Sequence, residues 1–194
     1  MKAVIVTAPI IEPVSVAEVK NHLRVSTNDD DALIASLIKS CREQVEQSTN
    51  RAIMTQTWDY FRDTCPSETA MTLPFGKLQS VTSVKWKDTD GSETTLVVST
   101  DYYVELNGER HGRIVLPYGV SWPTSVLYPS NPISVRLVCG WTTQELVPYR
   151  IKQAIMMLCA AQYEDRGEAI VGLTRIWNKT VDSLLFNERL WGGF

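Results

Sequence analysis

The sequence lacks most features that would identify a membrane protein or a basic nucleic-acid-binding protein. Its 194 residues carry 19 Lys and Arg against 22 Asp and Glu, so a basic surface that grips DNA or an anionic membrane is not expected. No apolar run approaches the roughly 18 residues that cross a bilayer. The apolar N-terminus is interrupted by Pro9, Glu12 and Pro13, too early for a signal-peptide core. We expect a protein made in the cytoplasm and not associated with a membrane.

The sequence is also poor in the residues that carry catalysis or bind metals. No C-x-x-C motif is present, and no glycine-rich phosphate-binding loop is present. We therefore expect reduced thiols, no disulfide framework, no metal and no cofactor. The cysteines and histidines are Cys41, Cys65, Cys139, Cys159, His22 and His111.

A hydrolase with an unrecognised site stays open as an alternative. It would use Cys139 or Cys159 as nucleophile with a histidine as base. No nucleophile lies in a G-x-S-x-G elbow, and His22 and His111 are better explained as surface or structural residues. We therefore expect a protein that is not an enzyme.

Two acidic segments resemble cation-binding loops without matching one. Residues 28–32, NDDDA, lack the glycine and the later glutamate of a calcium loop. Acidic residues are favourable at the N-terminus of a helix, which explains this segment. Residues 88–93, DTDGSE, join two alternating segments and are explained as a hairpin turn.

What is present begins with a helical block over residues 15–52. Ser15 followed by Glu18 predicts a capping box and a short helix over residues 16–23. A second helix is predicted from about Asp30 to Ser48, with one apolar stripe and a polar back. The stripe consists of Leu33, Ile34, Leu37, Ile38, Cys41 and Val45. The polar back consists of Lys39, Arg42, Glu43 and Glu46.

The middle of the chain has the pattern of short antiparallel strands. Alternating segments meet at the turn signals Asp90-Gly91 and Asn107-Gly108. Strands are predicted within residues 55–64, 70–74, 79–88, 94–99, 101–108, 113–117 and 133–141. A small antiparallel sheet or half-barrel follows.

A second helical block begins near Pro148, which suits the first position of a helix. Residues 154–161 are apolar on every side, so this helix must be surrounded by its own fold or by neighbouring subunits. We predict that it packs between subunits. The residues predicted for this packing are Ile151, Ile155, Met156, Met157 and Leu158.

The C-terminal tail is rich in aromatic residues and contains a last helical stretch near residues 180–189. Aromatic side chains near a chain end either dock onto a partner or fold back onto the core. We predict docking, and we expect removal of the chain from Gly172 onward to leave the fold largely intact. The docking residues are Trp177, Phe186, Trp191 and Phe194.

A third function is a module that binds single-stranded nucleic acid through the strand region. Trp86, Tyr102 and Tyr103 would be its stacking platforms. Packing within a sheet explains the same aromatic residues.

The fold class that follows is α+β, a helical frame with an inserted antiparallel sheet or half-barrel in one compact domain. Its predicted parts are a helical region 1–54, a β-rich insertion 55–146, a long helix 147–171 and a tail 172–194.

The order of these motifs resembles the head–tail connector, or adaptor, proteins of long-tailed bacteriophages. The resemblance lies first in V-x-E-V-K-x-H-L-R-V over residues 16–25 and in D-D-x-L-I-x-x-L-I-x-x-x-R-E-x-V-E over residues 30–46. Later segments also match the long form of that family, which carries a β insertion. These are LPFGKLQSVTSVKW with the following DTDG, Trp122-Pro123, VRLVCGW and VPYRIKQAIMMLCAAQYEDR.

The resemblance implies a non-enzymatic virion protein at the capsid vertex. It implies a homo-oligomeric ring of about twelve copies beneath the portal protein, with the C-terminal segment reaching the portal. Such a ring extends the channel for double-stranded DNA without binding the DNA tightly, and it offers a platform for stopper or tail-completion proteins. A weakly acidic chain suits that channel, because a basic wall would hold phosphates.

Overall fold

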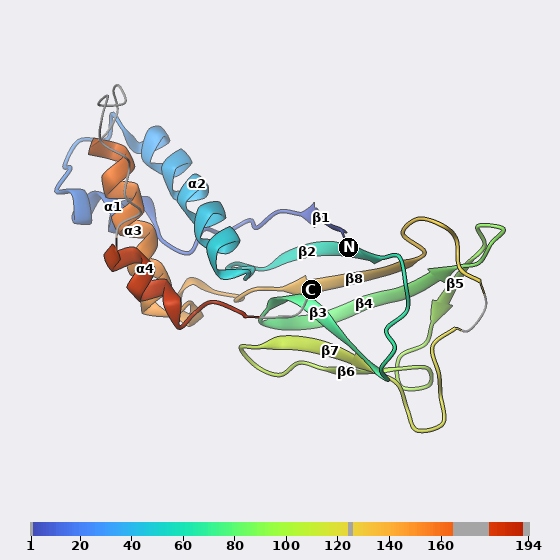
Figure 1. The fold of residues 1–194 in the computed structure, drawn as a ribbon. Coiled ribbons are helices and arrows are strands. Elements are labelled where there is room, and N and C mark those ends of the chain that lie inside the picture. The colour runs from blue at the N-terminus through green and yellow to red at the C-terminus, as the bar shows by residue number, and fades with distance from the viewer. Residues whose placement is uncertain (1, 124–125, 165–178, 192–194) are drawn as a thin grey trace. The chain divides into compact units, whose positions relative to one another are not determined.

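The computed structural model describes residues 2–123, 126–164 and 179–191, which fall into two compact units (Figure 1). The helical unit comprises Ile10–Met54 and Trp141–Arg189. The β unit contains Thr55–Gly140 together with both chain ends. Within the described residues there are four α-helices and two antiparallel sheets. The predicted α+β class is therefore confirmed.

The first helix, α1 (Val16–Leu23), begins at the predicted capping box. The backbone N–H of Ser15 donates to Glu18 Oε2 over 2.7 Å, and the N–H of Glu18 donates to Ser15 Oγ over 3.2 Å. These bonds supply acceptors for backbone N–H groups that have no partner within the first turn of a helix. Val19 is then buried against the helical core.

The second helix, α2 (Asp31–Thr49), ends where Asn50 adopts a left-handed conformation with φ 54°. The predicted stripe is largely confirmed: Ile34, Ile38, Cys41 and Val45 are buried. Leu33 is an exception, since 38% of it is exposed.

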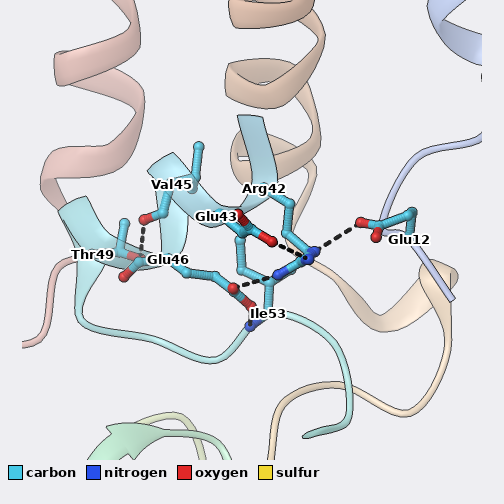
Figure 2. Close-up of polar contacts among 7 residues, drawn as sticks. All are labelled: Glu12, Arg42, Glu43, Val45, Glu46, Thr49 and Ile53. Carbon is cyan, nitrogen blue, oxygen red and sulfur yellow. Dashed lines mark hydrogen bonds and ion pairs between the residues drawn. The ribbon is translucent and has the colours of Figure 1, made fainter. Parts of the chain in front are cut away.

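Arg42 was predicted on the polar back of α2, and that prediction is wrong. It is only 2% exposed, and its guanidinium bonds Glu12, Glu43 and Glu46 (Figure 2). Arg42 follows Ile38 by four residues and precedes Val45 by three, so it borders the buried stripe. A buried arginine needs carboxylate partners, and these three residues supply them.

Two further helices complete the helical core. A single 3₁₀ turn, η1 (Gln144–Leu146), leads into α3 (Tyr149–Glu164). Pro148, predicted as the first residue of this helix, instead lies immediately before it, and its carbonyl accepts from the N–H groups of Ile151 and Lys152. The last helix, α4 (Lys179–Phe186), packs against α3 and α2.

The larger sheet of the β unit has the strand order β1-β2-β8-β4-β5. Its strands are β1 (Lys2–Thr7), β2 (Gln56–Arg62), β8 (Ile133–Cys139), β4 (Leu78–Lys87) and β5 (Glu93–Leu96). No element is predicted for residues 2–7, yet they form the edge strand β1. All six are exposed, so the inside–outside alternation that would identify a strand is missing.

The smaller sheet has the order β3-β7-β6, so the β unit holds two sheets where one was predicted. Its strands are β3 (Ala70–Gly76), β7 (His111–Val115) and β6 (Tyr103–Glu105). The predicted hairpins are confirmed: Gly91 and Gly108 lie in turns at φ 83° and 60°, between β4 and β5 and between β6 and β7.

The two sheets touch closely at a glycine. A Cβ atom added to Gly112 of β7 would lie 2.2 Å from Cδ2 and 2.9 Å from Cβ of Leu78 in β4. The rings of Trp58 in β2 and Phe75 in β3 are also 4.4 Å apart, centroid to centroid. Buried side chains of both sheets, among them Leu73, form the core of this unit.

Candidate assembly surfaces

The residues of α3 predicted to pack between subunits divide into two groups. Ile151 and Ile155 are 0% exposed and lie in the core of the helical unit. Met156, Met157 and Leu158 are partly buried and pack against that core. Because α1, α2 and α4 already surround α3, the subunit's own fold explains why this helix is apolar all round. Only the second group keeps surface for a neighbour, and its packing between subunits stays a prediction.

The aromatic residues predicted to dock lie partly within the described chain. Phe186 at the end of α4 is 56% exposed, and Trp191 is 66% exposed. Exposed aromatic side chains are the type that anchors protein interfaces. Trp177 and Phe194 lie outside the described residues.

The structure corrects the expectation that the segment from Gly172 onward is dispensable for folding. Val181 and Leu185 of α4 are 1% and 0% exposed and belong to the core of the helical unit. The backbone carbonyl of Glu188 accepts a hydrogen bond from Arg51 Nε. Truncation at residue 172 would remove a core helix, so portal docking must be tested by point substitution.

Both cysteines considered as the nucleophile of a hydrolase, Cys139 and Cys159, are buried. Hydrogen bonding to Cys41 and burial raise the pKa of the Cys159 thiol, which disfavours the thiolate that a nucleophile needs. His22, in the same unit, is exposed on α1. In the β unit, Cys139 is buried in β8, and His111 Nδ1 lies 3.1 Å from the carbonyl oxygen of Leu73.

The first acidic segment has partners within the helical unit. Lys20 Nζ donates to Asn28 Oδ1 and Asp31 Oδ1 at 2.6 and 2.7 Å, and the Tyr163 hydroxyl donates to Asp30 Oδ2 at 2.6 Å. This segment therefore connects α1, α2 and α3.

The second acidic segment is a hairpin turn. Asp88 Oδ1 accepts hydrogen bonds from the N–H groups of Asp90 and Ser92, and each N···O distance is 3.0 Å. Among residues 2–123, 126–164 and 179–191, no group of three or more His, Cys, Asp or Glu side chains is arranged to hold a metal ion.

The three aromatic residues considered for stacking nucleic-acid bases do not form a common platform. Tyr102 is only 3% exposed. Trp86 lies on β4 of the larger sheet, whereas Tyr103 lies on β6 of the smaller one. Trp86 instead lines a cavity of about 290 Å³ together with Leu96 and Trp122. Within the described parts of the chain, no helix is long and apolar enough to cross a bilayer.

Residues 13–103 match the family model described as phage gp6-like head-tail connector protein. The matched segment contains the capping box, α2 and the hairpin between β4 and β5. The predicted resemblance to head–tail connectors is confirmed. No curated protein matches the chain.

Solved structures with the same fold cover the whole chain. One chain in a structure titled "Neck of empty GTA particle computed with C6 symmetry" has a TM-score of 0.79 and 21% identity, over 100% of this chain and 98% of that one. A chain in "Virion of native gene transfer agent (GTA) particle" gives 0.78 and 21%, with the same coverage. A third, in "Neck of native GTA particle computed with C12 symmetry", gives 0.76 and 20%, again with the same coverage. The helical and β units therefore share the fold of these chains over their full length.

Sequence reasoning missed two buried arginines in this connector-like chain. Arg42 is 2% exposed and Arg51 is 5% exposed. The position of Arg42 beside the apolar stripe was a usable signal. No comparable sequence signal indicated the burial of Arg51, because its partners Trp141 and Glu188 are far away in the sequence.

Proposed function

We propose that this protein is a structural head–tail connector of a tailed phage or a phage-like particle, and that it has no catalytic role. The observation that supports this proposal is the match of residues 13–103 to the gp6-like connector family. The fold also agrees over the whole chain with neck proteins. Its place would be the virion, at the interface between head and tail.

In this proposal about twelve copies form a closed ring beneath the portal protein. The C12 symmetry named for one neck structure supports that number. Cyclic rings need a heterologous interface, in which two different patches of each subunit meet. Met156, Met157 and Leu158 are candidates for one such patch, since they keep partial exposure on α3.

The proposed ring extends the DNA channel and carries the stopper or tail-completion protein. A net charge of −3 is compatible with DNA that slides without being held, because phosphate binding needs an excess of Lys and Arg. Phe186 and Trp191 are the proposed contacts to the portal, as exposed aromatic residues near the chain end.

The test is to image purified particles by electron microscopy and to quantify this protein by mass spectrometry. We expect a ring of about twelve copies between the portal and the tail, and heads without tails when the gene is deleted. Absence of the protein from mature particles would overturn the proposal. A monomeric state of the isolated protein would not, since rings of this kind can close on their partner.

A further inference from the structure

The chain passes four times between the helical unit and the β unit. The passages follow Pro9, Met54, Gly140 and Arg189. Near each of these four crossing points, which we call passages, one residue of the helical unit makes a hydrogen bond, an ion pair or a cation–π contact within that unit. These residues are Glu12, Ile53, Trp141 and Glu188.

Arg42 holds the first two passages, as Figure 2 shows. Its Nε donates to Glu12 Oε2 over 2.8 Å, and its Nη1 donates to Glu46 Oε2 over 2.6 Å. The second oxygen of Glu46, Oε1, accepts from the backbone N–H of Ile53 over 2.8 Å. Glu46 therefore links the arginine directly to the segment that follows α2.

Arg51 holds the other two passages. Its guanidinium carbon lies 5.9 Å from the centre of the Trp141 ring, within range of a cation–π contact. Its Nε donates to the carbonyl oxygen of Glu188. The same arginine therefore contacts one segment entering the helical unit and one leaving it.

The two sets of contacts are joined to each other. The N–H of Trp141 donates to the carbonyl of Ile53 over 2.8 Å, and Gln144 Nε2 donates to the carbonyl of Glu12 over 2.6 Å. Ile53 thus takes part in both sets. Joined polar groups in a buried site stabilise one another, so losing one contact weakens the others.

We infer that Arg42 and Arg51 act as a single joint in the helical unit, which couples the four passages so that loosening one loosens all. Both arginines are buried, at the energetic cost that burial of a charge carries. Burial lowers the pKa of Arg42, but Glu46 and Glu12 outweigh that effect and raise it, so the group stays charged. A permanently charged, forked donor can hold several segments at once.

The experiment measures amide hydrogen exchange, residue by residue, in the full chain. The variants are Arg42→Lys, Arg51→Lys and Glu12→Ala, with Arg136→Ala as the matched control. Arg136 forms an exposed two-bond pair with Asp59 in the β unit, outside the joint.

We expect each joint variant to speed exchange at amides that its own side chain does not touch. Arg42→Lys should speed it at Trp141 and Glu188, and Arg51→Lys at Ile53, by about tenfold or more, equivalent to about 1.4 kcal/mol in the free energy of local opening. Exchange at Ile38, in the middle of α2, should stay as in the parent, and Arg136→Ala should leave all four passages unchanged.

Faster exchange only at residues that a substituted side chain contacts directly would overturn the joint. Glu12→Ala decides the question if an arginine variant unfolds, because the Glu12 side chain is 28% exposed and its removal leaves both arginines in place. It should still speed exchange at Ile53 and Trp141, and unchanged exchange there would refute the coupling.

Discussion

Ser15 and Glu18 show how two side chains begin a helix that the rest of the unit uses. Their reciprocal hydrogen bonds fix the first turn of α1, and Val19 one residue later is completely buried. The backbone N–H and the hydroxyl of Ser15 both donate to the Glu18 carboxylate, and these bonds lower the pKa of Glu18. The cap therefore depends on pH.

Replacing Ser15 by alanine should lower the free energy of unfolding by about 1 kcal/mol, the usual cost of losing an N-cap. Glu18→Ala should also destabilise the protein at pH 7, where the carboxylate is ionised. A group whose pKa is lowered by folding contributes above its unfolded pKa, about 4.3, and loses that contribution as pH falls through the folded value.

Urea denaturation of the parent and of Glu18→Ala between pH 7 and pH 3 checks this sign. The stability difference between the two proteins should shrink toward the acidic end. A constant difference over the whole range would mean that the carboxylate charge does not support the cap. Asn21→Ala, on an exposed position of the same helix, is the control.

At the residue scale, local patterns predicted the contacts that are close in sequence and failed for those that are distant. The capping box needs only a separation of three residues. The burial of Arg42 depends on Glu12, thirty residues away, and that of Arg51 on Trp141 and Glu188. The position of Arg42 beside the apolar stripe of α2 signals its burial, but no periodicity in α2 identifies these distant partners.

At the scale of elements, helices and hairpins were predictable because their signals are local. Edge strand β1 was not, since its six residues are exposed on both faces and only its pairing with β2 makes it a strand. The division into two sheets was also hidden. It depends on which strands pair, β3 with β7 and β4 with β8, over long separations in the sequence.

The approach of the two sheets gives a prediction about Gly112. Alanine at this position in β7 places a Cβ against Leu78, closer than real atoms come. We expect a loss of about 1–3 kcal/mol in stability, the usual cost of overpacking a core. Thermal or urea denaturation of Gly112→Ala measures it.

The double variant Gly112→Ala with Leu78→Ala tests the cause. Leu78→Ala removes Cδ2, the atom of the closest contact, and leaves Cβ in place at 2.9 Å, so the two losses should be less than additive. Additive losses would show that the contact with Leu78 Cδ2 is not the cause of the strain at Gly112.

At the scale of the whole molecule, the order of motifs predicted more than any single motif. Neither a capped helix nor a D-G hairpin specifies a function. Their succession over residues 13–103 matches one connector family, and the fold agrees with neck proteins over the whole chain. The interfaces were less predictable. An apolar helix such as α3 has the same sequence pattern whether its own subunit or a neighbouring subunit covers it.

The surface that joins this protein to a particle can be tested through Phe186 and Trp191. Both are more than half exposed, so Phe186→Ala and Trp191→Ala should leave the free energy of unfolding nearly unchanged. If these rings anchor the portal contact, each substitution should weaken it by about 2 kcal/mol or more, roughly thirtyfold, as for other aromatic interface anchors. The number of copies per particle should then fall in a strain that carries only the variant.

Tyr118→Ala, at an exposed aromatic residue of the β unit, is the control and should enter particles normally. Normal incorporation of both tail variants would exclude the tail aromatics as the portal contact and leave the three partly exposed residues of α3 as the next surface to test.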